Sequence, residues 1–184
     1  MDVGARALAS LALSAVELPG AAQRLRTASD ELRMREDLAE GDALVAEVQS
    51  VAKDGVAQLH TRGKRYGQCG AGCCLRLASA SLTPRTKRHV APPGGASGAA
   101  GVVCGANGRV WCGDLPGGSD ASAAGAAAAH RAAAAAKALG DLELPVTVAA
   151  IEAALALAEA QGVLTADLAA EPFRQRLLQA HTLN

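Results

Sequence analysis

The clearest alternation of apolar and polar positions lies in the segment ALVAEVQSVAKDGVAQLHTR, residues 43–62. Leu44, Ala46 and Val48 alternate with the residues between them, which is the two-residue period of a strand buried on one face. Asp54-Gly55 then supplies the positive φ angles of a tight turn, and residues 56–60 return along a second strand. The pattern predicts a β-hairpin.

The N-terminal segments carry weaker signals. Residues 5–18 predict one strand or short helix, which Pro19-Gly20 closes. A single short helix follows, because Thr27 or Ser29 can cap its first turn and Gly41 can end it.

A second β region follows the hairpin. Glycines precede a short strand from Cys73 to Leu77. The segment GVVCGANGRVWCG, residues 101–113, has Asn107-Gly108 between apolar runs, which is a strong hairpin signal. Two loops of low complexity, residues 91–101 and 113–125, bracket this predicted hairpin.

The C-terminal third is predicted to be helical. Residues 126–140 are rich in alanine and stop at Gly140. A further helix begins near Thr147 and carries one apolar stripe, formed by Val148, Ile151, Leu155 and Ala158. A last helix has Pro172 in its first turn. Strands followed by helices predict an α+β fold in two modules.

Composition limits the classes of partner. The 184 residues hold 18 Lys and Arg against 18 Asp and Glu, so no global field attracts nucleic acid or membrane. Any RNA contact must come from local patches. No run of about 18 apolar residues occurs, which predicts no membrane partner.

The five cysteines test the possibility of a zinc site. Their odd number favours reduced thiols over a disulfide framework. Cys69, Cys73 and Cys74 form a possible half-site, and Cys104 with Cys112 the other half. If Asn107-Gly108 is a two-residue turn, Cys104 and Cys112 point to opposite faces; only an odd loop length would bring them together. We therefore expect thiols packed as small core residues, and no metal.

No catalytic pattern emerges. The four histidines show no nearby nucleophile and base, and lie at His60, His89, His130 and His181. No paired carboxylates stand out, GQCGAG lacks the spacing of a dinucleotide fingerprint, and there is no phosphate-loop lysine. The sequence predicts no catalytic residue and no cofactor. A small enzyme or zinc protein stays open as the alternative class.

Two basic segments are candidates for nucleic-acid binding. The first, HTRGKRYG, follows a predicted strand and combines cations with a ring that can stack on a base. The second is TPRTKRH. The candidate RNA contacts are Arg62, Lys64, Arg65 and Tyr66, followed by Arg85, Lys87 and Arg88. The alternatives are a solvated loop, or a loop that docks on an acidic partner. GANG, residues 105–108, also fits the Gly-x-x-Gly clamp of KH domains.

Several of these segments occur together in one known family. The specific ones are LHTR…YG within residues 54–67 and GANGRVW at 105–111. The others are LPG (18–20), DELRMREDLAEGDALVAEVQSV (30–51), GAG (70–72) and ASLTPRTKRH (80–89). In this order and spacing they resemble ribosomal RNA-processing protein 4, the RNA-binding cap subunit of the eukaryotic RNA exosome.

The resemblance implies a fold and a role. Residues 1–66 would form an incomplete OB-type S1 barrel, because the family has strands before the position of Met1, and residues 67–184 a KH-like domain. Gly105, Asn107, Gly108 and Trp111 would be a structural motif near the contact of the two domains. Cys69, Cys73, Cys74 and Cys112 fall where the family has aliphatic core residues.

The implied function is non-catalytic. The chain would join a hetero-oligomer of RNase PH-like ring subunits and other cap subunits, in the nucleus, nucleolus and cytoplasm. There it would help to thread RNA towards a separate 3′→5′ exonuclease. A free-standing module that binds single-stranded RNA outside any assembly is the alternative.

Overall fold

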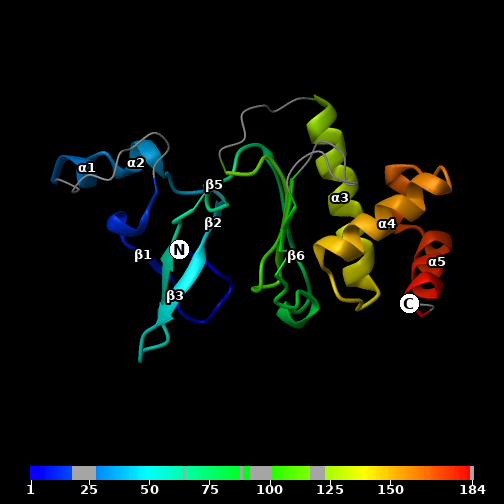
Figure 1. Cartoon of the computed structure of the whole chain (residues 1–184), viewed down its shortest axis with the longest axis horizontal. Helices are drawn as coiled ribbons and strands as arrows, with labels where there is room; N and C mark the ends of the chain where they lie inside the picture. The colour runs from blue at the N-terminus through cyan, green and yellow to red at the C-terminus, as the bar shows by residue number, and fades with distance from the viewer. Residues whose placement is uncertain (18–27, 64, 88, 92–100, 117–122, 183–184) are drawn as a thin grey trace. The chain divides into compact units, whose positions relative to one another are not determined.

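The computed structural model describes residues 1–17, 28–63, 65–87, 89–91, 101–116 and 123–182 (Figure 1). The chain divides into two compact units, each described by itself. The N-terminal unit is Met1–Gly70 with Leu115–Ser119, and the C-terminal unit is Ala71–Asp114 with Asp120–Asn184. Strands and helices both contribute, so the fold class is α+β.

The N-terminal unit contains the first predicted hairpin. Its three-stranded sheet has the order β1-β4-β3, with β1 parallel to β4 and β3 antiparallel to it. The strands of this unit are β1 (Ser10–Leu11), β2 (Leu44–Val45), β3 (Glu47–Val51), β4 (Ala57–His60) and β5 (Gly67–Gln68). At the turn, the Gly55 N–H donates to the Ala52 carbonyl at 2.9 Å. The hairpin prediction is confirmed, but Gly55 has a positive φ and Asp54 does not. The loop holds the three residues 53–55, because the Ala52 N–H donates to the Val56 carbonyl at 2.9 Å.

The predicted half-burial of this hairpin is wrong for β3. All five residues of β3 are exposed, and Val48 keeps 54% of its surface accessible. The physical reason is that, in the described part of the chain, β3 packs substantially only against β4 within its own sheet, so no other element covers its side chains. Alternation predicts a strand, but it does not predict which face is covered.

The single helix predicted before Gly41 is two short helices. They are α1 (Ala28–Leu32) and α2 (Met34–Asp37), preceded by a 3₁₀ turn, η1 (Leu13–Ala15). Leu32 is 87% exposed. Because helices this short gain stability mainly from a packed apolar face, an exposed leucine leaves little to extend them. Thr27, one of the two predicted caps, lies outside the described residues.

The C-terminal unit pairs an antiparallel sheet with helices. The sheet has the order β6-β9-β8-β7, and in Figure 1 the helices lie together on one side of it. Its strands are β6 (Gly72–Arg76), β7 (Val90–Ala91), β8 (Gly101–Cys104) and β9 (Arg109–Gly113). Its helices are α3 (Ala123–Asp141), α4 (Val148–Ala160) and α5 (Glu171–Thr182), with 3₁₀ turns η2 (Ala80–Leu82) and η3 (Thr165–Ala169). Across the described residues, none of the helices has the length and apolar character that a membrane crossing requires.

The core of this unit consists mainly of small side chains. The apolar stripe predicted for α4 is buried, and the Thr147 hydroxyl caps the helix by accepting from the Ala150 N–H at 3.1 Å. Helix α3 packs against β9 and β6, and its buried alanines, including Ala132, Ala135 and Ala136, belong to the core of this unit. Gly140 does not stop α3 as predicted; a Cβ there would lie 2.8 Å from Leu77 Cδ2, so the glycine permits a close contact.

The second predicted hairpin forms with a different register. Strands β8 and β9 pair Cys104 with Val110 and Val102 with Cys112. The Gly105 N–H donates to the Arg109 carbonyl at 2.8 Å, so the loop holds the three residues 106–108. The two-residue turn at Asn107-Gly108 is therefore wrong by one residue. Gly108 has φ +76°, a left-handed conformation typical of such three-residue loops.

This register overturns the prediction that the thiols diverge. An odd loop length places Cys104 and Cys112 on the same face, because a shift of one residue exchanges the two faces of a strand. Cys73 joins them, since β6 pairs it directly with Cys112. Cys104 and Cys112 belong to the core that α3 covers, and Cys73 packs against that core.

The three thiols on this face are nevertheless protonated core groups. Burial raises the pKa of Cys104 and of Cys112 to about 12. Burial, with a smaller effect from Cys74, also raises the pKa of Cys73, whose Sγ lies 3.7 Å from the Cys112 carbonyl oxygen. Metals and electrophiles need the thiolate. No three His, Cys, Asp or Glu side chains of the described residues are placed to hold a metal ion.

We expect the substitution Ile151→Ala to destabilise the C-terminal unit by about 2–5 kcal/mol, because Ile151 is fully buried in its core. The measurement is urea unfolding followed by fluorescence of Trp111, the single tryptophan, which lies in this unit. The control is Leu164→Ala, because Leu164 is 69% exposed. Equal losses of stability in the two variants would contradict this description of the core.

We also expect stability to fall as pH rises from 9 towards 12. The unfolded thiols titrate near 9.0 and the folded ones near 12, so in this window the unfolded state binds fewer protons. Each thiol lowers the free energy of unfolding by up to about 1.4 kcal/mol per pH unit. Cys112→Ala should flatten this dependence and Cys74→Ala, at an exposed position, should not. An unchanged slope in Cys112→Ala would refute the assignment.

Candidate nucleic-acid interface

The first candidate site is the loop that follows β4, residues 61–66, which we call the basic loop. Arg62 and Arg65 are exposed, and Lys64 lies outside the described residues. The loop closes on itself, because the Tyr66 N–H donates to the Gly63 carbonyl at 3.0 Å. Both described arginines therefore offer guanidinium groups to solvent, as phosphate contacts require.

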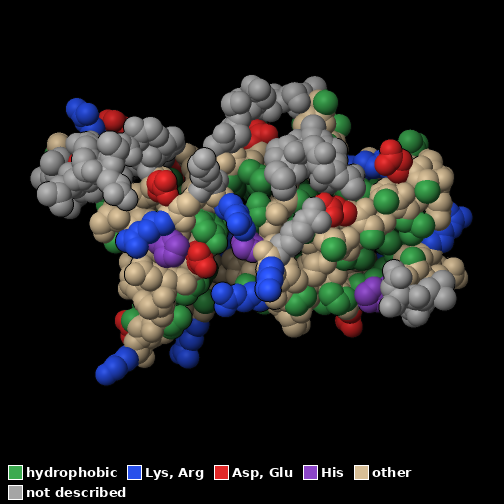
Figure 2. Space-filling model, viewed as in Figure 1, with side chains coloured by type: hydrophobic (Ala, Val, Ile, Leu, Met, Phe, Trp, Pro, Cys, Tyr) green, Lys and Arg blue, Asp and Glu red, His purple; other side chains and the backbone are tan. Residues whose placement is uncertain are grey.

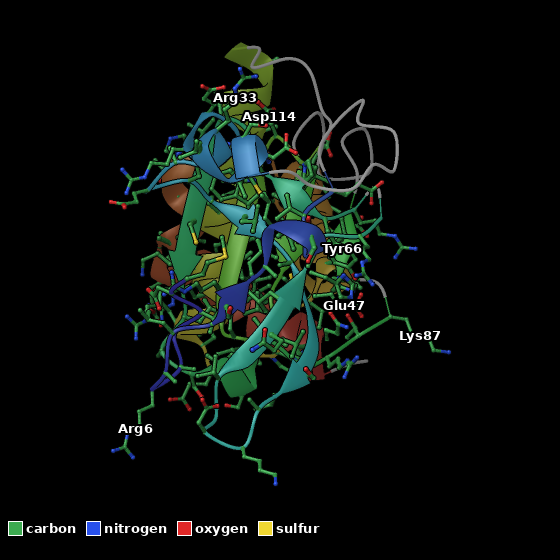
Figure 3. All side chains as sticks on the ribbon, turned by 90° about the vertical axis from the view of Figure 1, so that its left-hand side faces the viewer. Arg6, Arg33, Glu47, Tyr66, Lys87 and Asp114 are labelled. Atoms are coloured by element: carbon green, nitrogen blue, oxygen red, sulfur yellow. The ribbon has the colours of Figure 1, made fainter. Side chains whose placement is uncertain are left out.

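Tyr66 is held by a neighbour that the sequence reasoning did not include. The rings of His60 and Tyr66 meet edge to face, with centroids 6.2 Å apart and an interplanar angle of 88°. His60 Nε2 lies 3.9 Å from Glu47 Oε2 on the paired strand. Figure 3 shows Tyr66 and Glu47 on the same side of the N-terminal unit. Tyr66 is half-buried, and its edge-to-face contact with His60 restricts the orientation of its ring.

The second candidate site belongs to the C-terminal unit. Arg85 and Lys87 are exposed on the segment between η2 and β7, and Arg88 lies outside the described residues. Thr83, just before them, is 3% exposed and anchors the segment. In Figure 2 the Lys and Arg side chains project at several separate places, in keeping with a net charge of zero. The two basic clusters belong to different units of the chain.

The Gly105–Gly108 loop is held from inside its own unit. The Gly108 N–H donates to Gly105 O and to the buried Thr83 Oγ1, each at 3.1 Å. The Gly108 carbonyl accepts from the Leu77 N–H at 2.9 Å. A Cβ on Gly108 would lie 3.0 Å from Ala80 Cα. Since these backbone groups bind protein atoms, the geometry favours a structural loop over a clamp for a phosphate backbone.

Trp111 and Asn107 have local partners as well. The Trp111 indole N–H donates to the Asp114 carbonyl at 3.2 Å, and Asn107 Oδ1 accepts from the Arg109 N–H at 3.3 Å. Trp111 pairs with Cys74 across the sheet, so it occupies the face opposite the thiols of the core. These contacts fix the hairpin and its strand ends.

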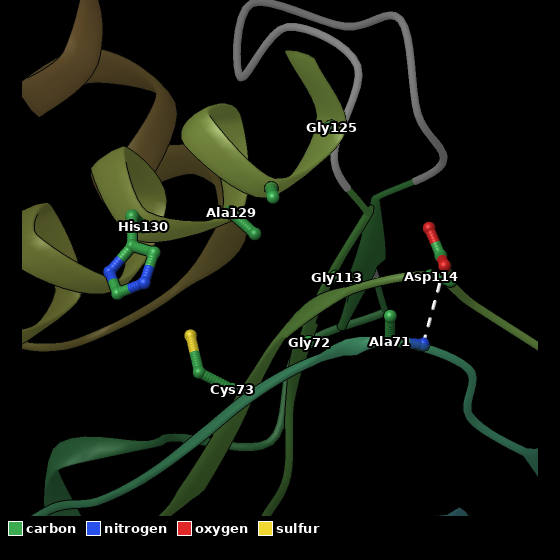
Figure 4. Close-up of a pocket in the computed structure, with 9 residues that line it drawn as sticks. Ala71, Gly72, Cys73, Gly113, Asp114, Gly125, Ala129 and His130 are labelled. Atoms are coloured by element: carbon green, nitrogen blue, oxygen red, sulfur yellow. Dashed lines mark hydrogen bonds between the residues drawn. The ribbon is translucent and has the colours of Figure 1, made fainter. Parts of the chain in front are cut away.

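A small cleft in the C-terminal unit combines a thiol with an imidazole. Cys73 on β6 and His130 on α3 both line it, together with glycines and alanines, and its volume is about 160 Å³ (Figure 4). At its rim the Ala71 N–H donates to Asp114 Oδ2 at 3.3 Å. The raised pKa of Cys73 keeps its thiol protonated, so the pair lacks the activated nucleophile that covalent catalysis needs.

The family model and the similar proteins all carry the name RRP4. The family model described as RRP4, S1 domain, matches residues 1–50. Exosome complex component RRP4 of Mus musculus is 42% identical over 126 residues, which is 68% of this chain and 41% of that protein. The Saccharomyces cerevisiae component is 45% identical over 112 residues, 60% of this chain and 30% of the relative.

The Schizosaccharomyces pombe component is 40% identical over 111 residues, again 60% of this chain, and 32% of the relative. The chain thus spans between 30% and 41% of the length of these relatives. Relatives from two fungi and a mammal carry the same name, and the family model covers the segment before the basic loop. The chain belongs to the RRP4 family.

Proposed function

We propose that this chain is a non-catalytic RNA-binding cap subunit of the RNA exosome, which helps to bind and thread RNA for 3′→5′ processing and degradation. The observation that carries the proposal is the 42% identity to a named exosome component over 126 residues. A match of that length in a chain of 184 residues includes its middle, where both basic clusters lie.

The proposal gives each unit a fold. The N-terminal unit is part of an OB-type S1 domain, supported by the family model over residues 1–50 and by short strands paired around β4. The C-terminal unit is a KH-like domain, supported by an antiparallel sheet with helices on one side. In this proposal its Gly105–Gly108 loop has a structural role in packing.

The proposed RNA contacts are charges and one ring. Arg62, Lys64 and Arg65 bind phosphates, and Tyr66 stacks on a base. Arg85, Lys87 and Arg88 form a second set. The absence of catalysis is supported by the protonated thiols, whose raised pKa values make them poor nucleophiles. The proposed partners are RNA, the RNase PH-like ring subunits and the other cap subunits.

Affinity purification of the tagged chain from cell extract tests the assembly. Recovery of RNase PH-like subunits is the expected result, and their consistent absence would refute the proposal. The variant Arg62→Ala, Lys64→Ala, Arg65→Ala should recover the same subunits, because the basic loop is proposed to bind RNA. If this variant loses the ring subunits, the loop docks on protein instead.

We expect the same triple variant to weaken RNA binding and to flatten its dependence on salt. Removing one phosphate contact reduces the steepness of log K against log salt by about 0.7 for a single strand. The matched control is Arg6→Ala, Arg33→Ala, Arg35→Ala, which removes three exposed positive charges from the same unit. The measurement is a fluorescence-anisotropy titration at several salt concentrations. Equal slopes for the triple variant and the control would show that the basic loop does not bind the RNA.

A further inference from the structure

Glu17 contacts the basic loop at two points. Its backbone N–H donates to Thr61 Oγ1 at 3.0 Å, and its carboxylate Oε2 accepts from the Gly63 N–H at 2.5 Å. A third bond on the same segment, from the Thr61 N–H to the Ala15 carbonyl, measures 3.0 Å. The residues just before Pro19 are thus joined to both sides of Arg62.

The contacts fix the part of the loop that needs an external constraint. Gly63 has φ +105°, a left-handed backbone conformation, and its N–H points to the carboxylate. Thr61 is fully buried and anchors the first residue of the loop. Arg62 lies between these two held residues and is exposed. Its backbone is therefore set by Glu17, while its side chain extends to solvent.

The charge of Glu17 opposes the proposed function of its neighbours. A carboxylate close to a phosphate-binding loop repels RNA, and within the Debye length of about 8 Å at physiological salt this repulsion is only partly screened. Charge alone therefore predicts that removal of Glu17 strengthens RNA binding. The conformation of the loop predicts weaker RNA binding when Glu17 is removed, because the loop loses the acceptor that holds the Gly63 N–H. The two explanations differ in sign.

We propose that Glu17 is a positioning residue for RNA binding: it holds the basic loop so that Arg62 and Arg65 present their guanidinium groups together with the Tyr66 ring. This inference rests on the proposed function, since it concerns the same surface. Glu17 acts through the loop and does not touch RNA. The side-chain amide of Gln retains an acceptor oxygen for the Gly63 N–H and removes the charge, so Glu17→Gln separates the two properties.

The experiment compares Glu17→Ala, Glu17→Gln and a control in binding to a single-stranded oligoadenylate. The control Glu40→Ala removes an equal charge from a pair with Arg35 on the surface of the same unit, where Glu40 is 94% exposed. We expect Glu17→Ala to weaken binding about threefold to tenfold, and Glu17→Gln to bind as tightly as the unmodified chain or more tightly. Glu40→Ala should leave binding unchanged or slightly tighter.

The same substitution is then made in the background Arg62→Ala, Arg65→Ala. A residue that acts through the arginines loses its effect there, so Glu17→Ala should leave the remaining binding within about twofold. In addition, amide hydrogen exchange at Gly63 should accelerate at least about tenfold in Glu17→Ala, measured without RNA. This second readout tests the hydrogen bond itself.

Three results would overturn the inference. They are tighter binding by Glu17→Ala, an equal loss of affinity in both backgrounds, and unchanged exchange at Gly63. The proposed function fails in a different way: the unmodified chain would then bind no oligoadenylate at all, which overturns both. Binding that is present but insensitive to Glu17 overturns the positioning role alone.

Discussion

The register of the β8–β9 hairpin determines the organisation of the C-terminal unit. A three-residue loop places Val102, Cys104, Val110 and Cys112 on one face, and these residues form the sheet side of the core. A loop shorter by one residue would turn part of this set to the other face. The left-handed Gly108, fixed through Thr83 and Leu77, therefore controls the packing of the two strands that flank it.

Small side chains make up much of the core of this unit. The alanines of α3 and the thiols of Cys104 and Cys112 lie in one core together with larger aliphatic groups such as Val102 and Ile151. Buried in this way, Cys104 and Cys112 have pKa values of about 12 and remain neutral at physiological pH. Three thiols on one face thus belong to the packing, and the same burial that stabilises the unit removes their reactivity.

Much of the fold could be predicted from local sequence. Asp54-Gly55 and Asn107-Gly108 both mark chain reversals, and the period of Val148, Ile151, Leu155 and Ala158 identifies α4 and its buried face. The predictions were wrong where a local sequence pattern is compatible with more than one structure and packing selects between them. Asn-Gly does not distinguish a two-residue from a three-residue loop, and alternation in β3 does not state whether a partner covers it. The candidate arginines come from two basic segments of the sequence, but the sequence does not point to Glu17, because its contact to Gly63 joins residues 46 positions apart.

The Gly105–Gly108 loop and the basic loop are each held through the N–H of a glycine. Gly108 and Gly63 both have positive φ, and each gives its N–H to a side chain distant in sequence, Thr83 in one loop and Glu17 in the other. A glycine N–H held in this way is not free to bind a phosphate oxygen, so neither loop binds a nucleic acid backbone through these amides. In the proposed function, recognition is then left to arginine and lysine side chains and a stacking ring. Such contacts are sensitive to salt and tolerant of sequence, which suits a subunit proposed to guide many different RNAs.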